Sequence, residues 1–181
     1  MIVRKSNVSD IELINHKLSD LCEKKLKSLS ISKNSFTEKY LAQLWSAISY
    51  SLIGGKRLRG RLLMATSQAV FGVETFQQLP KPTQTLVLDA SMAIECVHAF
   101  SLVHDDLPCM DDDKLRRGKN TLHIEYDEGL ALLAGDALQT LGTEILTSSD
   151  MQKIRRFRLV RELAVATGAA GMAGGQAIDI K

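Results

Sequence analysis

Apolar side chains recur every three to four positions along most of the chain, which is the spacing of amphipathic helices. In residues 8–29 the repeat runs through Ile11, Ile14, Leu18, Leu21 and Leu29. Similar repeats predict further helices over 36–53, 59–70, 83–107 and 128–147, and a last one from near Met151 to the chain end. The helix over 36–53 is expected to bury Tyr40, Leu44, Ala47 and Leu52.

The segment 83–107 is apolar on most sides, which is typical of a buried central helix. Gly54 and Gly55 interrupt the helix over 36–53, and Pro108 is placed to end or distort the central helix. Residues 109–126 are charged and predict a loop, and no segment alternates convincingly as a strand would. The pattern therefore predicts an all-α fold, one helical domain over residues 1–181.

The last segment, ELAVATGAAGMAGGQAIDIK, is small, apolar and rich in glycine. A helix of this composition is expected only where another element packs closely against it. We therefore expect either a partner chain that covers residues 162–181, or a chain that is the front part of a longer protein.

Composition excludes several classes of protein. A net charge of +2 and an aromatic content of 5% argue against nucleic-acid binding, which favours clustered basic and stacking side chains. The three cysteines form no CxxC pair, so reduced thiols in the cytoplasm are expected rather than disulfides or zinc. The polar start lacks the apolar core of a signal peptide, and no long uninterrupted apolar run predicts a membrane span.

The stretch HDDLPCMDDDKLRRG concentrates five aspartates within nine residues: Asp105, Asp106, Asp111, Asp112 and Asp113. Such carboxylates repel one another and need a counter-charge, and Mg²⁺ prefers oxygen ligands and often binds through one or two carboxylates plus phosphates. Arg116 and Arg117 follow closely and suit bidentate phosphate contacts. A solvated, self-neutralising surface loop is the plainer alternative. The adjoining apolar helix favours a magnesium-dependent diphosphate site.

A second charged motif, GGKRLRG at 54–60, lies upstream. Its glycines permit close backbone approach, and Lys56, Arg57 and Arg59 offer three cations at a helix start, where backbone amides also favour anions. Together the two motifs predict two anion sites, one formed through metal and one formed directly by cations.

Four stretches then carry a family resemblance: LIGGKRLRGRLL, ECVHAFSLVHDDLPCMDDDKLRRGKNTLH, LLAGDALQTL and GMAGGQAID. From about residue 45 to 181 the chain resembles the trans-prenyltransferase (polyprenyl diphosphate synthase) family, in particular its bacterial farnesyl diphosphate synthases. The resemblance implies a helical bundle of the isoprenoid-synthase type around a central cavity, here without the C-terminal helices, and a homodimer. It also implies Mg²⁺-assisted condensation of an allylic diphosphate, dimethylallyl or geranyl, with isopentenyl diphosphate to give farnesyl diphosphate.

The resemblance assigns roles to individual residues. The metal-binding positions are Asp105, Asp106, Asp111 and Asp112, with Asp105 and Asp111 the surest ligands. Arg116 matches the arginine on the allylic diphosphate, and Asp105, Asp111 and Arg116 are the expected catalytic residues. The isopentenyl diphosphate site matches Lys56, Arg59, His98 and Arg117. Gln176 and Asp179 match a later motif that lines the cavity. Phe100 and Ser101, one helical turn before Asp105, match the positions that limit product length.

The remaining histidines and aspartates have plainer interpretations. His104 is expected to hydrogen-bond in support of the aspartates, and His16 and His123 to lie on the surface or in loops. Asp113 is expected in solvent, and Asp136 would need a partner if buried.

Two departures from the family pattern matter. Gly60 stands where the family usually has proline, which is expected to loosen the basic turn. The family's second aspartate-rich motif is also missing, so the 181-residue chain alone is expected to be inactive. Two other functions stay open: an HD-type metal phosphohydrolase using His98, His104 and Asp105, and a non-catalytic partner subunit of a full-length synthase.

Overall fold

The computed structural model describes residues 8–29, 35–148 and 153–180. The chain begins with α1 (Val8–Leu29), α2 (Ser35–Leu52), α3 (Leu58–Phe71) and the short 3₁₀ helix η1 (Phe76–Gln78). The central helix α4 (Lys81–Asp105) leads into the strands β1 (Leu115–Arg116) and β2 (Lys119–Asn120). The chain continues with α5 (Leu122–Glu125), α6 (Glu128–Thr147), α7 (Lys153–Thr167) and α8 (Met172–Asp179). The all-α prediction is confirmed.

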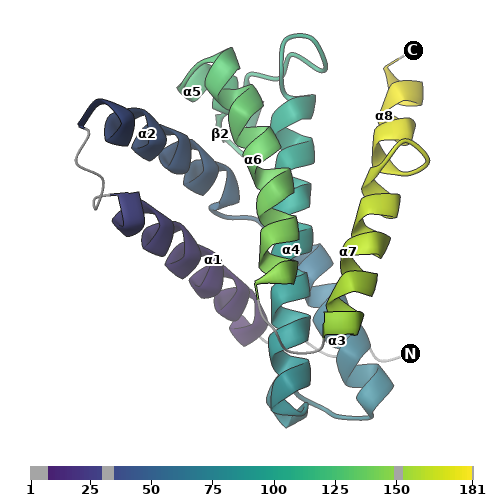
Figure 1. Ribbon diagram of the computed structural model, residues 1–181. Coiled ribbons are helices and arrows are strands. Elements are labelled where there is room, and N and C mark those ends of the chain that lie inside the picture. Colours follow the sequence, from purple (N-terminus) through teal and green to yellow (C-terminus); the bar gives the residue numbers. More distant parts are fainter. Residues whose placement is uncertain (1–7, 30–34, 149–152, 181) are drawn as a thin grey trace.

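Helix α4 forms the axis of the molecule (Figure 1), and its closest packing partner is α6, followed by α3. Small side chains allow the close approach of α4 and α6, with Ala93 on one helix and Ala131 and Ala134 on the other almost fully buried. Helices α1 and α2 contribute Ile14 and Ile48 to the same core. The expectation that 83–107 is a central, buried helix is therefore confirmed.

By length and apolar composition, α4 also passes as a membrane span. However, 56% of its most apolar window is buried inside the protein, as in the core helix of a folded domain. The packing of α4 against α3 and α6 accounts for its hydropathy without a membrane.

The structure differs from the sequence prediction in several parts of the fold. Residues 115–120 form a two-stranded antiparallel hairpin, pairing Leu115 with Asn120, whereas a plain loop was expected. Two-residue strands are too short to produce an alternating pattern. The last helix is broken between α7 and α8, where Gly168 and Gly171 flank the interruption and glycine is a weak helix former. Tyr40, predicted to be core, is 51% exposed; Met151 lies outside the described residues.

Candidate active site

The two charged motifs meet at one end of α4. A pocket of about 220 Å³ separates them, with Gly54 and Gly55 on one wall and Asp106, Arg116 and Arg117 on another. Apolar side chains of α4 and α5 complete the pocket, namely Ala99, Leu102, Val103 and Leu122. The fold thus brings residues some sixty positions apart to one cavity that has charged and apolar walls.

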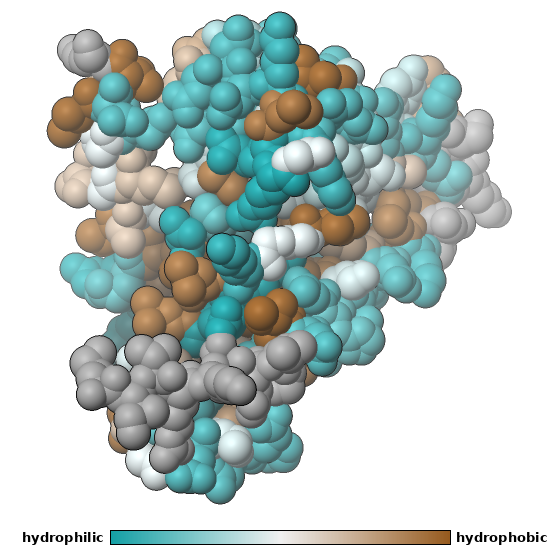
Figure 2. Space-filling model, turned by 180° about the vertical axis from the view of Figure 1, so that it is seen from behind, coloured by the Kyte–Doolittle hydropathy of each residue, from teal (hydrophilic) through white to brown (hydrophobic). Residues whose placement is uncertain are grey.

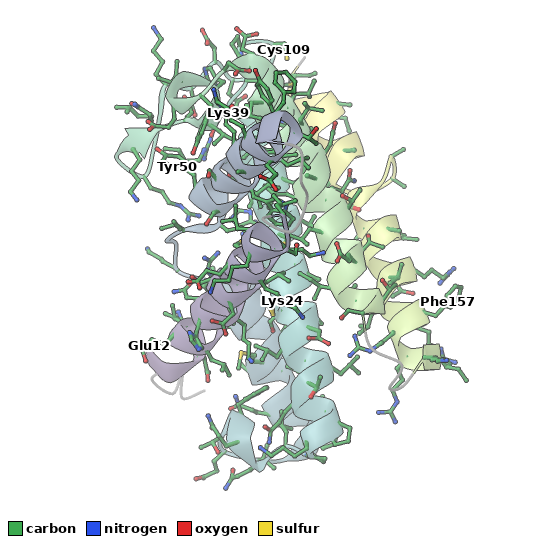
Figure 3. The ribbon with its side chains drawn as sticks, turned by 60° about the vertical axis from the view of Figure 1, so that its left-hand side comes forward. Glu12, Lys24, Lys39, Tyr50, Cys109 and Phe157 are labelled. Atoms are coloured by element: carbon green, nitrogen blue, oxygen red, sulfur yellow. The ribbon has the colours of Figure 1, made fainter. Side chains whose placement is uncertain are left out.

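Tyr50 on α2 closes this region from the side of the hairpin. Its hydroxyl donates to the Asn120 carbonyl at 2.9 Å, and its ring meets Tyr126 edge-on at 6.2 Å between centroids. Figure 3 shows Tyr50 directed toward the hairpin segment, with Cys109 marking the aspartate-rich loop above it. No sequence pattern pointed to Tyr50, because its partner is a backbone carbonyl.

Gly55 makes the contact between the motifs possible. Its φ of +90° lies in the region that L side chains rarely adopt, and a Cβ built there would overlap the Arg117 guanidinium. Arg117 itself has a φ of 55° and forms the hairpin turn with Gly118. The hairpin therefore packs Arg117 directly against the glycine turn, which is the backbone of residues 54–60.

The aspartate-rich loop folds back over the end of α4. The Asp111 amide donates to the Asp105 carbonyl at 2.8 Å, and the Asp112 amide to the Leu107 carbonyl at 3.2 Å. Burial raises the pKa of Asp105, and the nearby Asp111 carboxylate raises that pKa further. The two carboxylates are thus close enough to repel each other, as expected for a chain that turns back at Pro108.

Asp106 has a different environment from Asp105. Its carboxylate is almost fully buried and accepts a 2.6 Å hydrogen bond from Arg116 Nε, while Arg116 Nη2 also contacts Asp113 at 3.3 Å. Burial raises the pKa of Asp106, and the Arg116 hydrogen bond offsets part of that rise. Asp106 therefore holds Arg116 in place, and its role as a metal ligand stays a prediction. Asp113 is exposed, as expected, and also helps to anchor Arg116.

The donor chemistry of this loop fits Mg²⁺. In the described residues, no group of three or more His, Cys, Asp or Glu side chains is placed to hold a metal. A magnesium ion needs fewer, because substrate phosphates and water supply its other oxygen ligands. The mutual repulsion of Asp105 and Asp111 is the kind that a cation would relieve.

Two of the three cations in the glycine turn are free to meet a ligand. Lys56 and Arg59 are exposed, whereas Arg57 is only 6% exposed and pairs with Glu95 at 3.4 Å. Sequence reasoning was wrong to count Arg57 among the available cations. It also missed Glu95, whose acidic side chain inside an apolar helix was the signal that could have pointed to a buried ion pair.

His98 lies among the arginines of both motifs. Burial lowers its pKa to about 4, and the positive charges of Arg59, Arg117 and Arg116 contribute to that decrease. The ring is therefore neutral at pH 7 and can still donate one hydrogen bond to an anion. Arginines of both motifs thus influence His98 electrostatically, and its contact with a diphosphate stays a prediction.

Other predicted residues lie elsewhere or have other partners. Gln176 and Asp179 are on α8, which packs mainly against α7, so their role in a cavity stays a prediction. Phe100 and Ser101 are half-buried on α4, and the Phe100 ring meets the His104 ring edge-on at 4.8 Å. Their control of product length likewise stays a prediction.

The histidines adjoining the motifs behave differently from expectation. His104 Nε2 lies 3.1 Å from the Leu132 carbonyl and 3.8 Å from Asp136, so it ties α4 to α6 rather than to an aspartate of the loop. Asp136 itself is exposed. His123, expected on the surface or in a loop, is buried beside Thr121, and its Nε2 has no hydrogen-bond partner among the described residues. The short α5 carries it inward.

Comparison with known proteins places this geometry in a family. Residues 41–181 match the polyprenyl synthetase family model. The chain is 51% identical to farnesyl diphosphate synthase of Escherichia coli K12 over 133 residues, which are 72% of this chain and 41% of that protein. It is 38% identical to the Bacillus subtilis farnesyl diphosphate synthase over 174 residues, covering 93% of this chain and 55% of the relative.

Solved structures agree with the sequence matches. An FPP/GFPP synthase from Zymomonas mobilis superposes with a TM-score of 0.68 at 39% identity, covering 91% of this chain and 58% of that one. A geranyltransferase from Helicobacter pylori gives a TM-score of 0.69 at 32% identity, covering 97% and 58%. The chain thus spans about half the length of the relatives that it matches. With the family model covering residues 41–181, the chain belongs to the polyprenyl synthetase family.

Proposed function

We propose that this chain provides the diphosphate-binding half of a prenyltransferase that joins an allylic diphosphate to isopentenyl diphosphate and gives farnesyl diphosphate. The observation that carries the proposal is the meeting of the aspartate-rich loop and the glycine turn at one pocket. Farnesyl diphosphate synthases among the relatives support the choice of reaction.

The aspartate-rich loop is proposed to receive the allylic diphosphate. Asp105 and Asp111, with Asp106 and Asp112 beside them, would hold Mg²⁺, and Arg116 would contact the same diphosphate. Magnesium supplies charge stabilisation for the departing diphosphate when it is bound. Asp106 and Asp113 keep the Arg116 guanidinium aimed at that region, so little reorganisation is needed as charge develops on the leaving group.

The glycine turn is proposed to receive isopentenyl diphosphate. Lys56, Arg59, His98 and Arg117 would bind this diphosphate without metal, so it is held but not activated to leave. The apolar wall of the pocket, which includes Ala99, Leu102 and Val103, would keep water from the allylic carbocation until the isopentenyl double bond reaches it. Gln176 would line the far part of the cavity.

The family resemblance also supports two expectations about the whole protein. We propose that it works in the cytoplasm, where its buried free thiols Cys22 and Cys96 would stay reduced, and that it forms a homodimer. Since the chain covers about half of its relatives, we propose that the 181 residues alone have little synthase activity.

Product analysis tests the proposal. The chain would be fused to the downstream part of the Escherichia coli relative, and geranyl diphosphate would be supplied with labelled isopentenyl diphosphate and Mg²⁺. We expect an extractable fifteen-carbon product from the fusion. Asp105→Ala should abolish this product, because it removes several kcal/mol of leaving-group stabilisation. Glu128 is an exposed acid outside the site, so Glu128→Ala should leave product formation unchanged.

The same assay separates the other functions. Release of inorganic phosphate without carbon-chain growth would indicate a phosphohydrolase, which the family match does not favour. Association with a full-length synthase, with no product from the fusion, would indicate a non-catalytic partner subunit. Either outcome would overturn the proposed reaction.

A further inference from the structure

A buried polar network lies directly beneath the glycine turn. Arg57 is at its centre: its Nε donates to Asn15 Oδ1 at 2.7 Å, its Nη1 to Glu95 Oε2 at 3.4 Å, and its Nη2 to the Leu52 carbonyl. These partners come from α1, α4 and the end of α2. One guanidinium thus fastens the start of α3 to three other helices.

Glu95 contacts the glycine turn at a second point. Its other oxygen, Oε1, accepts a hydrogen bond from the Gly60 amide at 2.9 Å. Proline at this position would have no amide hydrogen to donate. Glycine at position 60 was expected to loosen the turn. The hydrogen bond from its amide to Glu95, whose side chain is only 3% exposed, compensates for this effect.

The turn needs such an anchor because the backbone of Arg57 adopts an unfavourable left-handed conformation. Gly54 and Gly55 have φ values of 84° and 90°, and Arg57 has a φ of 47°, which is uncommon for a residue other than glycine. Such a conformation persists only where surrounding contacts hold it. Arg57 directly follows Lys56 and Gly60 directly follows Arg59, so each exposed cation adjoins a residue that Glu95 contacts.

Glu95 also lies beneath the third predicted contact. His98 follows it by three residues on α4, which places both on one face of the helix, and the charge of Glu95 influences the pKa of His98. One carboxylate is thus linked to Lys56 and Arg59 through the turn, and to His98 through the helix.

We propose that Glu95 is a positioning residue that, through Arg57 and the Gly60 amide, sets the spacing of Lys56, Arg59 and His98 for a metal-free diphosphate. This inference rests on the proposed function. Glu95 itself touches no substrate, because it is buried under the turn.

Calorimetric titration of the 181-residue chain with inorganic pyrophosphate, without metal, tests the inference. Glu95→Gln is expected to weaken binding roughly tenfold, since small displacements of positioned groups have effects of this size or larger. Because a lone buried Arg57 destabilises the fold, Arg57→Leu combined with Glu95→Leu serves as a second variant that removes the whole ion pair. It should show the same loss of affinity while the far-UV spectrum stays helical.

A control uses a second ion pair of α4, in which Arg156 is buried and Asp89 is half-buried. Arg156 contacts Asp89 at 2.7 Å, away from the turn, so Asp89→Leu combined with Arg156→Leu removes a similar pair without changing pyrophosphate affinity. In a Lys56→Gln, Arg59→Gln background, Glu95→Gln should weaken binding much less, because it acts largely through the two missing cations.

The outcomes separate this inference from the proposed function. If the wild-type chain binds pyrophosphate without metal but both Glu95 variants bind equally well, the positioning role is wrong and the cation site stands. An equal loss of affinity in the control pair would also contradict it, since any buried ion pair would then serve. If the wild-type chain fails to bind at all, the cation site falls, and this inference with it.

Discussion

Phe100 is the residue on which product length is predicted to depend. It lies on α4 about one turn before Asp105, half-buried, with its ring edge against His104. If it forms the floor of the chain-elongation cavity, Phe100→Ala in the fusion should give products longer than fifteen carbons while turnover persists. Chromatography of the products measures this.

The matched control for Phe100 is Phe76, a buried phenylalanine of η1 remote from the aspartates. Phe76→Ala should lower stability by about 3–5 kcal/mol without changing product length. A Phe100→Ala variant that behaves like Phe76→Ala, active but with an unchanged product, would make Phe100 an ordinary core residue.

His98 predicts a pH dependence of stability. Its pKa falls from 6.5 to about 4 on folding, because burial and the nearby arginines disfavour the charged ring. Between these two values the unfolded chain binds a proton that the folded chain does not, so this residue makes stability fall as the pH drops. Above pH 6.5 neither the folded nor the unfolded chain binds this proton, so His98 no longer makes the stability depend on pH.

Urea denaturation of the wild type and of His98→Gln at pH 7 and pH 5 checks this sign. The variant should lose less stability than the wild type over that interval, because glutamine binds no proton. Parallel losses in the two proteins would show that His98 has the same pKa folded and unfolded.

At the scale of elements, the packing of α4 on α6 depends on a missing side chain. Gly135 lies where a Cβ would overlap the His104 ring, whose Nε2 lies 3.1 Å from the Leu132 carbonyl. Gly135→Ala should therefore destabilise the fold by about 1–3 kcal/mol through overpacking. Thermal melting followed by circular dichroism measures the change.

Gly175→Ala provides the comparison for that substitution. Gly175 lies in α8, and a Cβ there would meet nothing within 4 Å, so alanine should be neutral or slightly stabilising through its helix propensity. Equal effects at Gly135 and Gly175 would contradict the close contact between His104 and α6.

Periodicity predicted the long helices well, because their apolar repeats persist over several turns and the core residues Ile14, Leu18 and Ala47 follow them. It failed where the deciding contact is distant in sequence. The ion pair of Arg57 with Glu95 joins residues 38 positions apart, and nothing local to GGKRLRG distinguishes the buried arginine from the exposed one. His123 is buried by a four-residue helix that is too short for any pattern to indicate.

The candidate site was likewise predictable where the signal is local in sequence, and not where it depends on the fold. The sequence showed the aspartates and the cations of the glycine turn as charged motifs next to an apolar helix. Pro108 gave a reason for the aspartate-rich loop to fold back. The carboxylate of Asp106 could not be separated from that of Asp105 by sequence. Only the fold shows that Asp106 is buried against Arg116.

For the whole molecule, the surface of α7 and α8 predicts self-association. Figure 2 shows apolar side chains along the edge of the molecule where these helices lie, and Figure 3 shows Phe157 projecting outward from α7. The exposed apolar residues on these two helices include Ile154, Phe157, Val165 and Ile178. Exposed apolar surface of this kind favours association.

Size-exclusion chromatography with light scattering should therefore find the 181-residue chain as oligomers whose size grows with concentration. Phe157→Lys combined with Ile154→Lys should shift the chain toward monomer. Exposed Leu62 on α3 offers a control, since Leu62→Lys lies on another helix and should change little. A wild-type chain that stays monomeric at high concentration would contradict the prediction.

The central claim is that one end of this fold holds two anion sites, one that needs magnesium and one that does not. Calorimetric titration of the chain with pyrophosphate, with and without Mg²⁺, tests it most directly. We predict one binding event without metal and a second that appears only with Mg²⁺. Asp105→Ala should remove the second and spare the first, and Lys56→Gln combined with Arg59→Gln should do the reverse. A single event, lost equally in both variants and indifferent to Mg²⁺, would contradict the account.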